Sequence, residues 1–444
     1  MKDNRTDPTA RHDAHYDAKH DAQHDAHYDE LETRSPAARD AALALALPAQ
    51  VRAALAVPAM AQRLGAVDPA RVSTRAALAA LPVTRKSELL DAQKASRAAG
   101  GDPFGGFSAL GWRAHSALRP ARRVFQSPGT LYEPEGAAPD SWRMARALHA
   151  AGLRRGDLVH NSFSYHLTPA GSMMEAGAHA LGCTVFPGGI GNTELQLQAM
   201  QDLQPDAYAG TPSFLRILFE KAAETGVALH SLKKALVSGE AFPPALRDWL
   251  AARGLQAYQC YATADVGLIA YETSARAGLV VDEAAIVEIV RPGTGDVLPE
   301  GEVGELVVTV LNPDYPLLRF ATGDLSAVLP GFCATGRTNA RIRGWMGRAD
   351  QTAKVRGMFV HPAQVAEVVK RHPEISKARL VVDGQMANDR MTLHIECALP
   401  PEGLAAAVAQ SLRDVTKLRA EVAMAAPGSL PNDGKVIADA RPIG

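Results

Sequence analysis

The chain has 444 residues and 47% hydrophobic content, so it is long enough to form two or three domains with sizeable cores. Its 47 Lys and Arg nearly balance its 48 Asp and Glu, which provides no overall positive field for binding nucleic acid or an anionic membrane. The four cysteines form no C-x-x-C pair, which argues against a zinc ribbon or a disulfide framework and fits a reducing cytoplasm.

Residues 1–35 are predicted to form a disordered, solvated tail. They carry the degenerate repeat HDAHYDAKHDAQHDAHYDE, which has almost no aliphatic side chain to bury. Histidine tracts can hold metal, but the irregular spacing favours a plain tail. The apolar stretch 41–51 contains Pro48 and is shorter than the roughly 20 residues that span a bilayer. It also lies too far into the chain, behind an acidic leader, for a signal peptide, so neither export nor a membrane partner is expected.

The next two segments predict helices and then a covered sheet. Residues 35–100 are rich in alanine with helical spacing, which prolines such as Pro48 and Pro58 interrupt, so short helices packed on a larger body are expected. From about 140 to 265, helical runs alternate with short β-rich runs. This alternation predicts a parallel sheet flanked by helices. The β-rich runs are 158–162, 183–187, 207–210, 235–238 and 257–261.

The pattern changes twice in the remaining chain. The extended runs AIVEIV and GELVVTVL, joined by PGTG and NPDYP turns, predict an antiparallel β-subdomain between 285 and 329. After Gly344 the order strand, helix, strand, strand, helix, strand predicts a small α+β domain. The protein is therefore expected to be α/β, with a tail (1–35), a large N-terminal domain (36–346) and a small mobile C-terminal domain (347–444).

Four motifs carry a resemblance to a known family. They are YQCYATADVGL, YPLLRFATGDL, GRADQTAKVRGMFVHP and GSLPNDGKV. In this order and spacing they resemble the adenylate-forming (acyl-CoA synthetase) superfamily, and specifically its phenylacetate-CoA ligase branch. The resemblance implies ATP-dependent activation of a small aryl or arylacetic acid to an acyl-adenylate, followed by transfer to coenzyme A, with ATP, Mg2+ and coenzyme A as cofactors. Members of the branch often form homodimers.

The segment from Tyr261 to Asp265 resembles the family's aromatic-Gly-x-Thr-Glu element. The resemblance implies that the Tyr261 ring stacks near adenine, that Thr263 meets the α-phosphate and that Asp265 binds magnesium. Ala262 stands where the family has glycine, and Asp265 is one methylene shorter than the family's glutamate. It keeps the carboxylate oxygens that hard Mg2+ requires.

Further positions are assigned by the same resemblance. Asp324, in a glycine turn, matches the acceptor of the ribose hydroxyls, and Arg348 and Asp350 match the ribose-facing arginine and the hinge acid. Lys435 matches the mobile lysine that bridges the substrate carboxylate and the α-phosphate. Gly357 matches the glycine past which the thiol arm of coenzyme A enters. One site would thus run two reactions as the small domain rotates.

The segment 125–134, FQSPGTLYEP, resembles the family's phosphate loop in degenerate form. It keeps Ser127, Gly129 and Thr130, which are expected to contact the nucleotide phosphates. It loses the loop's lysine and second glycine, and it adds Glu133, an anion near the phosphates. Pyrophosphate binding is therefore expected to depart from the family pattern.

The adenine and acyl pocket is expected at a strand-to-helix turn and a nearby aromatic stretch. Phe163 and Tyr165 border the acyl pocket by resemblance and could face an aromatic ring, although packing under the sheet is an equally good interpretation. The turn consists of Ser238, Gly239, Glu240 and Ala241, with Ala241 on the substrate side.

Two other functions stay open. One is an adenylating enzyme with an amine, a carrier or water as acceptor, and the other is a non-catalytic paralogue that binds a nucleotide or acyl-adenylate. Retention of Asp265, Asp324, Arg348 and Lys435 together argues against the paralogue, because a scaffold has no physical need for all four. Cys260 is expected to be a buried cysteine, not a nucleophile.

Overall fold

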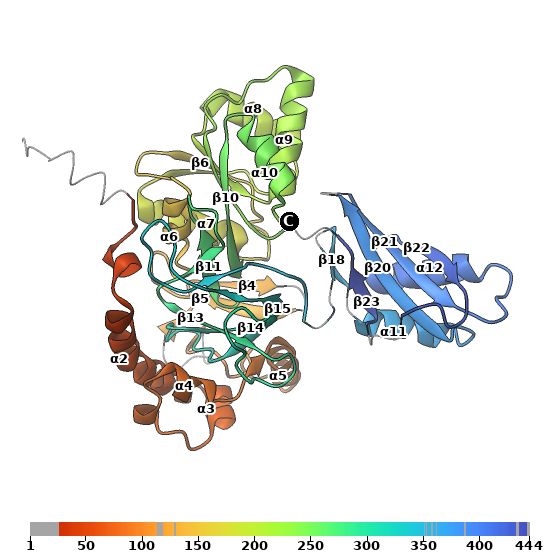
Figure 1. Ribbon diagram of the computed structural model, residues 1–444, viewed down its shortest axis with the longest axis horizontal. Coiled ribbons are helices and arrows are strands. Elements are labelled where there is room, and N and C mark those ends of the chain that lie inside the picture. The colour runs from red at the N-terminus through yellow and green to blue at the C-terminus, as the bar shows by residue number, and fades with distance from the viewer. Residues whose placement is uncertain are drawn as a thin grey trace, which may run out of the picture.

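The computed structural model describes residues 26–112, 119–127, 130–349, 351, 353–356, 358–360, 362–385, 388–431 and 435–441 (Figure 1). Three residues with expected roles, Gly129, Asp350 and Gly357, lie outside the described residues. Figure 1 shows a large body, coloured red to green, beside a smaller C-terminal body in blue.

A mixed nine-stranded sheet forms the centre of the large body, in the order β16-β17-β12-β11-β10-β9-β8-β6-β7. The strands from β10 to β7 pair in parallel, which confirms the predicted parallel sheet, and the remaining strands extend it in antiparallel fashion. Their bounds are β6 (Leu158–Asn161), β7 (Thr184–Pro187), β8 (Ala207–Gly210), β9 (Lys234–Val237), β10 (Gln256–Thr263), β11 (Gly267–Glu272), β12 (Leu279–Val281), β16 (Val328–Leu329) and β17 (Arg341–Ile342).

Helices cover both faces of this sheet because its strands are apolar on both sides. In β8, Ala207 and Ala209 join one buried cluster with residues of α6 and α7, whereas Tyr208 joins another with residues of α8, α9 and α10. This is the two-residue alternation of a strand. Figure 1 shows α8, α9 and α10 grouped together, away from α6 and α7. The helices are α6 (Met144–Ala150), α7 (Ala170–Leu181), α8 (Thr193–Leu203), α9 (Pro212–Thr225) and α10 (Pro244–Ala251).

The predicted antiparallel subdomain is a four-stranded sheet in the order β1-β15-β14-β13. β13 (Ala285–Val290), β14 (Gly304–Val310) and β15 (Phe320–Ser326) pair in antiparallel fashion, and β1 (Thr84–Arg85) adds in parallel to β15. Short two-stranded pieces lie in the same body, namely β2 (Leu110–Gly111) with β3 (Arg119–Pro120) and β4 (Arg123–Ser127) with β5 (Leu131–Glu135).

The N-terminal helices pack on this body, but α2 runs through the proline that was expected to break it. Helix α2 (Pro36–Leu55) contains Pro48, since the buried side chains of Leu47 and Val51 hold the helix against the core. The other elements here are η1 (Glu30–Thr33), α3 (Pro58–Leu64), η2 (Pro69–Arg71), α4 (Arg75–Ala79) and α5 (Lys86–Ala98). Among the described residues no single helix passes a length-and-hydropathy test for a membrane span; α2 and α3 pass it only as a pair bent by 112°.

The expected tail ends earlier than predicted, because residues 26–34 pack on the large body. Glu32 is fully buried, accepts a hydrogen bond from the Tyr271 hydroxyl and forms ion pairs with Arg146 and Arg337. Asp29 forms a second ion pair with Arg146 at 2.7 Å. Sequence composition missed this contact because the partners of Glu32 lie more than 100 residues away.

The C-terminal body has its own core, formed by residues from Ala353 to Ile437. A four-stranded sheet in the order β22-β21-β20-β23 packs against two helices. The short strand β23 was not predicted, because three residues give no clear alternation. The elements are β18 (Ala353–Val355), β19 (Met358–Val360), α11 (Pro362–Arg371), β20 (Lys377–Gln385), β21 (Asn388–Glu396), α12 (Leu404–Thr416), β22 (Glu421–Ala425) and β23 (Ile437–Asp439).

Residues 347–349 attach to the large body, whereas the predicted domains divide before residue 347. The Ala349 N–H donates to the Gly323 carbonyl at 2.7 Å, and the Leu325 N–H donates to the Gly347 carbonyl at 2.9 Å. The connection between the two bodies therefore follows Ala349.

Candidate active site

Several of the predicted site residues lie at or just beyond the ends of the parallel strands. β6, β8 and β9 stop at neighbouring positions of the sheet, with Asn161 opposite Ala209 and Gly210 opposite Val237. Ligands of open α/β sheets bind outside these carboxyl ends. β10 continues past its neighbour β9 and carries a register shift at Tyr261, a bulge of the kind that redirects side chains next to functional sites.

The carboxylate of Asp324 is the centre of the first cluster. Its Oδ2 accepts a hydrogen bond from the Tyr261 hydroxyl at 2.6 Å, and its Oδ1 accepts from Trp345 Nε1 at 3.1 Å and from Arg348 Nη1 at 2.8 Å. Asp324 and Arg348 also form a backbone bridge. The structure thus brings together Tyr261, Asp324 and Arg348, the three residues that the family resemblance assigned to the nucleoside.

This cluster keeps the Tyr261 hydroxyl protonated. Burial, and then the charge of Asp324, raise the pKa of the Tyr261 phenol well above its usual value. The hydroxyl therefore remains a hydrogen-bond donor to Asp324 at neutral pH. A carboxylate offers about four lone-pair sites, and Tyr261, Trp345 and Arg348 use three of those of Asp324, so it retains capacity for about one further donor.

Asp265 lies in a second cluster with a lysine that sequence reasoning gave no role. Its Oδ2 contacts Lys86 Nζ at 2.8 Å, at the N-terminus of α5. Its Oδ1 is buried and has no hydrogen-bond partner among the described residues. Desolvation lowers the pKa of Lys86, but the charges of Asp265 and Glu133 outweigh this effect and raise it. Thr263 caps the same turn, since its hydroxyl accepts from the Val266 N–H.

The segment that resembles the phosphate loop forms a hairpin between β4 and β5. The Ser127 hydroxyl donates to Glu133 Oε1, and Thr130 lies at the turn with a left-handed φ of 65°. Glu133 is 2% exposed, and its Oε2 has no partner among the described residues. Burial and the Asp265 charge raise the pKa of Glu133 to about 8, while Lys86 opposes the shift.

A tyrosine hydroxyl completes the second cluster. Tyr315 is 4% exposed, and its hydroxyl has no hydrogen-bond partner in the described part of the chain. Burial, followed by the charges of Glu133 and Asp265, raises its pKa. This phenol therefore lies within the electrostatic reach of both carboxyl groups.

The turn predicted to line the adenine and acyl pocket follows β9. Ser238 donates its hydroxyl to the Cys260 carbonyl at 2.9 Å, which ties the turn to β10. Gly239 has a left-handed φ of 81°. Glu240 accepts weakly from the Ser213 N–H at 3.4 Å, and Ala241 is exposed.

Of the two aromatic candidates, Phe163 lies beside this turn. A Cβ placed on Gly239 would lie 3.9 Å from the Phe163 ring, so the two residues are neighbours. The Tyr165 hydroxyl instead accepts a hydrogen bond from Asn161 Nδ2 at 2.7 Å. Phe163 is therefore the better candidate for contact with an acyl group.

The thiol of Cys260 is unsuited to nucleophilic attack. Burial raises its pKa to about 12, so the thiolate fraction is negligible at neutral pH. This agrees with the expectation of a buried cysteine without a catalytic role.

Lys435 lies in the C-terminal body, exposed and two residues before the start of β23. The next residue, Val436, donates its N–H to Gln351 Oε1 at 2.6 Å. The segment that contains Lys435 and leads into β23 is thus bound to Gln351, near the connection between the two bodies.

Comparison with known proteins identifies the family. Residues 164–310 match the model of the AMP-binding enzyme family. A phenylacetate-coenzyme A ligase of Aromatoleum evansii is 31% identical over 346 residues, which cover 74% of each chain. One of Thermus thermophilus is 31% identical over 350 residues, covering 75% of each chain. The chain belongs to the phenylacetate-CoA ligase family of AMP-binding enzymes.

A solved structure supports the fold of this family member over nearly its full length. 2-Hydroxyisobutyryl-CoA ligase in complex with 2-HIB-AMP and CoA superimposes with a TM-score of 0.75 at 23% identity, over 93% of this chain and 92% of that one. The amide bond synthetase McbA of Marinactinospora thermotolerans gives a TM-score of 0.52 at 19% identity, over 73% of this chain and 70% of that one. The adenylate-forming fold is thus confirmed.

The two clusters of this phenylacetate-CoA ligase family member contain three residues to which the sequence analysis gave no role, namely Lys86, Tyr315 and Trp345. Tyr315 opens the YPLLRFATGDL motif, and this position was the available signal for it. Lys86 and Trp345 lie outside the four motifs. The direction of each side chain depends on residues far away in the chain.

Proposed function

We propose that this chain uses ATP and Mg2+ to convert a small aryl or arylacetic acid into an acyl-adenylate and then transfers the acyl group to coenzyme A. The names of its relatives support this activity. The observation that carries the proposal is the convergence of Tyr261, Trp345 and Arg348 on the carboxylate of Asp324.

In this proposal Asp324 receives the ribose of ATP. Its carboxylate is held by three donors and is 8% exposed, so it is oriented before the nucleotide arrives. Preorganised acceptors of this kind reduce the cost of binding, because few groups need to be ordered. Arg348 adds a fixed positive charge beside the ribose and the α-phosphate.

Asp265, with its unpartnered buried Oδ1, fits a hard divalent cation, which prefers carboxylate oxygens. When bound, Mg2+ would neutralise charge on the phosphates of ATP. Lys86, held against Asp265, contributes a positive charge of this chain toward the same phosphates. Thr263, in the same turn, is proposed to meet the α-phosphate.

Lys435 is proposed to bridge the substrate carboxylate and the α-phosphate when the C-terminal domain closes. The Gln351–Val436 hydrogen bond supports coupled movement of Gln351 and the segment that contains Lys435. Rotation at Asp350 would then withdraw Lys435 and present Gly357 to coenzyme A, so that one site serves both half-reactions.

The acyl group is proposed to lie between Phe163 and the 238–241 turn. The position of Phe163 beside Gly239 supports contact between the acyl group and the Phe163 ring. The buried and unpaired state of all four cysteines supports the proposed cytoplasmic location.

The proposed function is tested by pyrophosphate exchange with a panel of benzoic, phenylacetic and small aliphatic acids. We expect exchange with at least one aryl or arylacetic acid in the absence of coenzyme A, and thioester formation after coenzyme A is added. ATP binding without exchange for any acid would contradict the catalytic proposal. Exchange without a thioester would show an adenylating enzyme with another acceptor.

A further inference from the structure

Three buried oxygen atoms beside the proposed phosphate site have no hydrogen-bond partner among the described residues. They are Oδ1 of Asp265, Oε2 of Glu133 and the hydroxyl of Tyr315. The three residues are only 6%, 2% and 4% exposed. Buried polar atoms in native proteins almost always have a partner, and an absent ion is one physical explanation for an exception.

The fold holds these groups in place from several directions. Gln93 of α5 exchanges two hydrogen bonds with the backbone of Tyr132, each 2.9 Å long, which fixes β5 against α5. Lys86 opens α5, and Glu133 follows Tyr132 on β5. The Gln93 contact therefore sets the position of Glu133 relative to Lys86 and, through it, to Asp265.

Among the described residues, each carboxylate has one oxygen with a hydrogen-bond partner and one without. Asp265 uses Oδ2 for Lys86, and Glu133 uses Oε1 for the Ser127 hydroxyl. The partnered oxygens hold each group in place, which leaves the second oxygen of each available to a ligand. Such supported carboxylates are typical of sites that bind cations.

The cluster offers a triphosphate no net positive charge. Asp265 and Lys86 carry opposite charges, and Glu133, whose pKa is raised to about 8, adds a negative charge when it loses its proton, so the sum is zero or negative. A divalent cation would make the sum positive. The segment that resembles the phosphate loop also lacks the loop's lysine and has Glu133 nearby.

We propose that Glu133 is a second carboxylate ligand, beside Asp265, of the divalent cation that accompanies the nucleotide. The cation would then supply at the β4–β5 hairpin the positive charge that a lysine supplies in the family's phosphate loop. Mg2+ in nucleotide sites is commonly held by one or two carboxylates together with phosphate oxygens and water. This assignment rests on the proposed function, because it takes the nucleotide to be ATP.

The test measures Mn2+ binding by electron paramagnetic resonance, with the full chain and α,β-methylene-ATP, which is not cleaved at the adenylation step. We expect Glu133→Gln to weaken Mn2+ binding in the ternary complex by at least about tenfold, the loss seen even for groups that only support a metal ligand. Asp265→Asn should cause a similar loss. Glu133→Asp should give an intermediate affinity.

Glu135→Gln is the matched control on the same strand. Glu135 is a buried carboxylate that pairs with Arg123, so its loss tests the general effect of removing a charge from β5. We expect Mn2+ binding of this variant to equal that of the unmodified chain. Thermal unfolding of each variant separates misfolding from loss of the metal.

Glu133→Lys is a second variant that keeps the inference falsifiable if Glu133→Gln folds poorly. It places a lysine near the phosphates, so we expect α,β-methylene-ATP to bind in EDTA more tightly than to the unmodified chain. The assignment would be overturned if folded Glu133→Gln bound Mn2+ as the unmodified chain does. It would also be overturned if binding of α,β-methylene-ATP depended on metal in Glu133→Lys as much as in the unmodified chain.

The outcome is separable from that of the proposed function. If the unmodified chain catalyses pyrophosphate exchange but Glu133→Gln binds Mn2+ normally, the ligand assignment fails and the function stands. If Mn2+ binding depends on Glu133 but no acid supports exchange, the function fails and the metal site stands.

Discussion

The hydroxyl of Tyr261 and the carboxylate of Asp324 are joined by a 2.6 Å hydrogen bond between residues 63 positions apart. This bond links β10 of the nine-stranded sheet to β15 of the four-stranded sheet. The proposed nucleoside site is therefore built across the junction of two sheets, and its geometry depends on both.

Replacement of Asp324 is expected to weaken ATP binding more than replacement of Tyr261. Asp324→Ala removes the proposed ribose acceptor, and a hydrogen bond to a charged group contributes about 1.5–3 kcal/mol, so the Kd for ATP should rise by at least about tenfold. Tyr261→Phe keeps the ring and leaves Asp324 with Trp345 and Arg348, so its effect should be smaller. Isothermal titration calorimetry measures both, with Tyr258→Phe on the same strand as control. Equal ATP affinity in Asp324→Ala and the unmodified chain would exclude Asp324 from the nucleotide site.

Lys435→Ala is expected to separate the two half-reactions. The rate of adenylation, measured by pyrophosphate exchange, should fall by at least about a hundredfold. A fixed charge aimed at the transition state contributes roughly 3–4 kcal/mol. Thioester formation from a preformed acyl-adenylate and coenzyme A should persist. Lys370→Ala, exposed on α11 of the same domain, is the control. An equal loss in both half-reactions would show that the proposed role of Lys435 is wrong.

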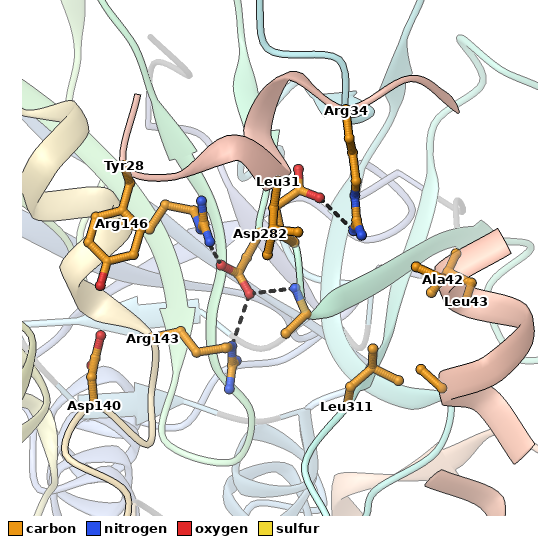
Figure 2. A pocket seen from close by; sticks show the side chains of 13 residues that line it. Tyr28, Leu31, Arg34, Ala42, Leu43, Asp140, Arg143, Arg146, Asp282 and Leu311 are labelled. Atoms are coloured by element: carbon orange, nitrogen blue, oxygen red, sulfur yellow. Dashed lines mark hydrogen bonds and ion pairs between the residues drawn. The ribbon is translucent and has the colours of Figure 1, made fainter. Parts of the chain in front are cut away.

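Glu32→Ala is expected to destabilise the large domain strongly. The change removes the carboxylate partner of the buried Arg337 and one partner of Arg146, which keeps its ion pair with the buried Asp282 (Figure 2). Breaking a buried ion pair costs about 3–5 kcal/mol. The exposed Glu30→Ala is the matched control and should stay within about 0.5 kcal/mol of the unmodified chain. Chemical denaturation monitored by tryptophan fluorescence measures the free energy of unfolding. Equal stability of the two variants would show that the Glu32 contacts contribute little.

His160 is expected to make stability fall in mild acid. Burial lowers the pKa of His160 below its usual 6.5, although its contact with Gln196 opposes the shift. The unfolded chain then binds more protons than the folded chain below pH 6.5, so the free energy of unfolding should decrease as the pH falls through this value. In His160→Phe this contribution is absent. The difference in the free energy of unfolding between this variant and the unmodified chain should therefore change between pH 7.5 and 5.5.

The control for this pH effect is His230→Asn, which removes an exposed histidine in place of a buried one. Parallel pH dependence in the unmodified chain and His160→Phe would show that other groups control stability in this range.

Sequence predicted the elements whose pattern is local. The parallel strands β6 to β10 and the order of helices in the C-terminal domain could be predicted, because β-rich and helical runs can each be recognised from a short stretch of sequence. The motif resemblance also brought Tyr261, Asp324 and Arg348 into one expected site, and the structure places them in contact.

Sequence could not predict contacts whose partners are distant and whose side chains are unremarkable alone. Lys86 is 179 positions from Asp265, and Glu32 is 305 positions from Arg337. Glu32 was assigned to the tail because the composition around it is polar, and its burial depends on arginines elsewhere. The continuation of α2 through Pro48 likewise depends on the core it packs against.

The hydrogen bond between Gln351 and Val436 joins the beginning of the C-terminal domain to the residue just before its last strand. A force applied near the end of the chain would therefore reach Gln351, next to the proposed hinge residue Asp350, without first unfolding the domain. A protein or tag fused to the C-terminus is therefore expected to alter how freely the C-terminal domain rotates in the proposed mechanism.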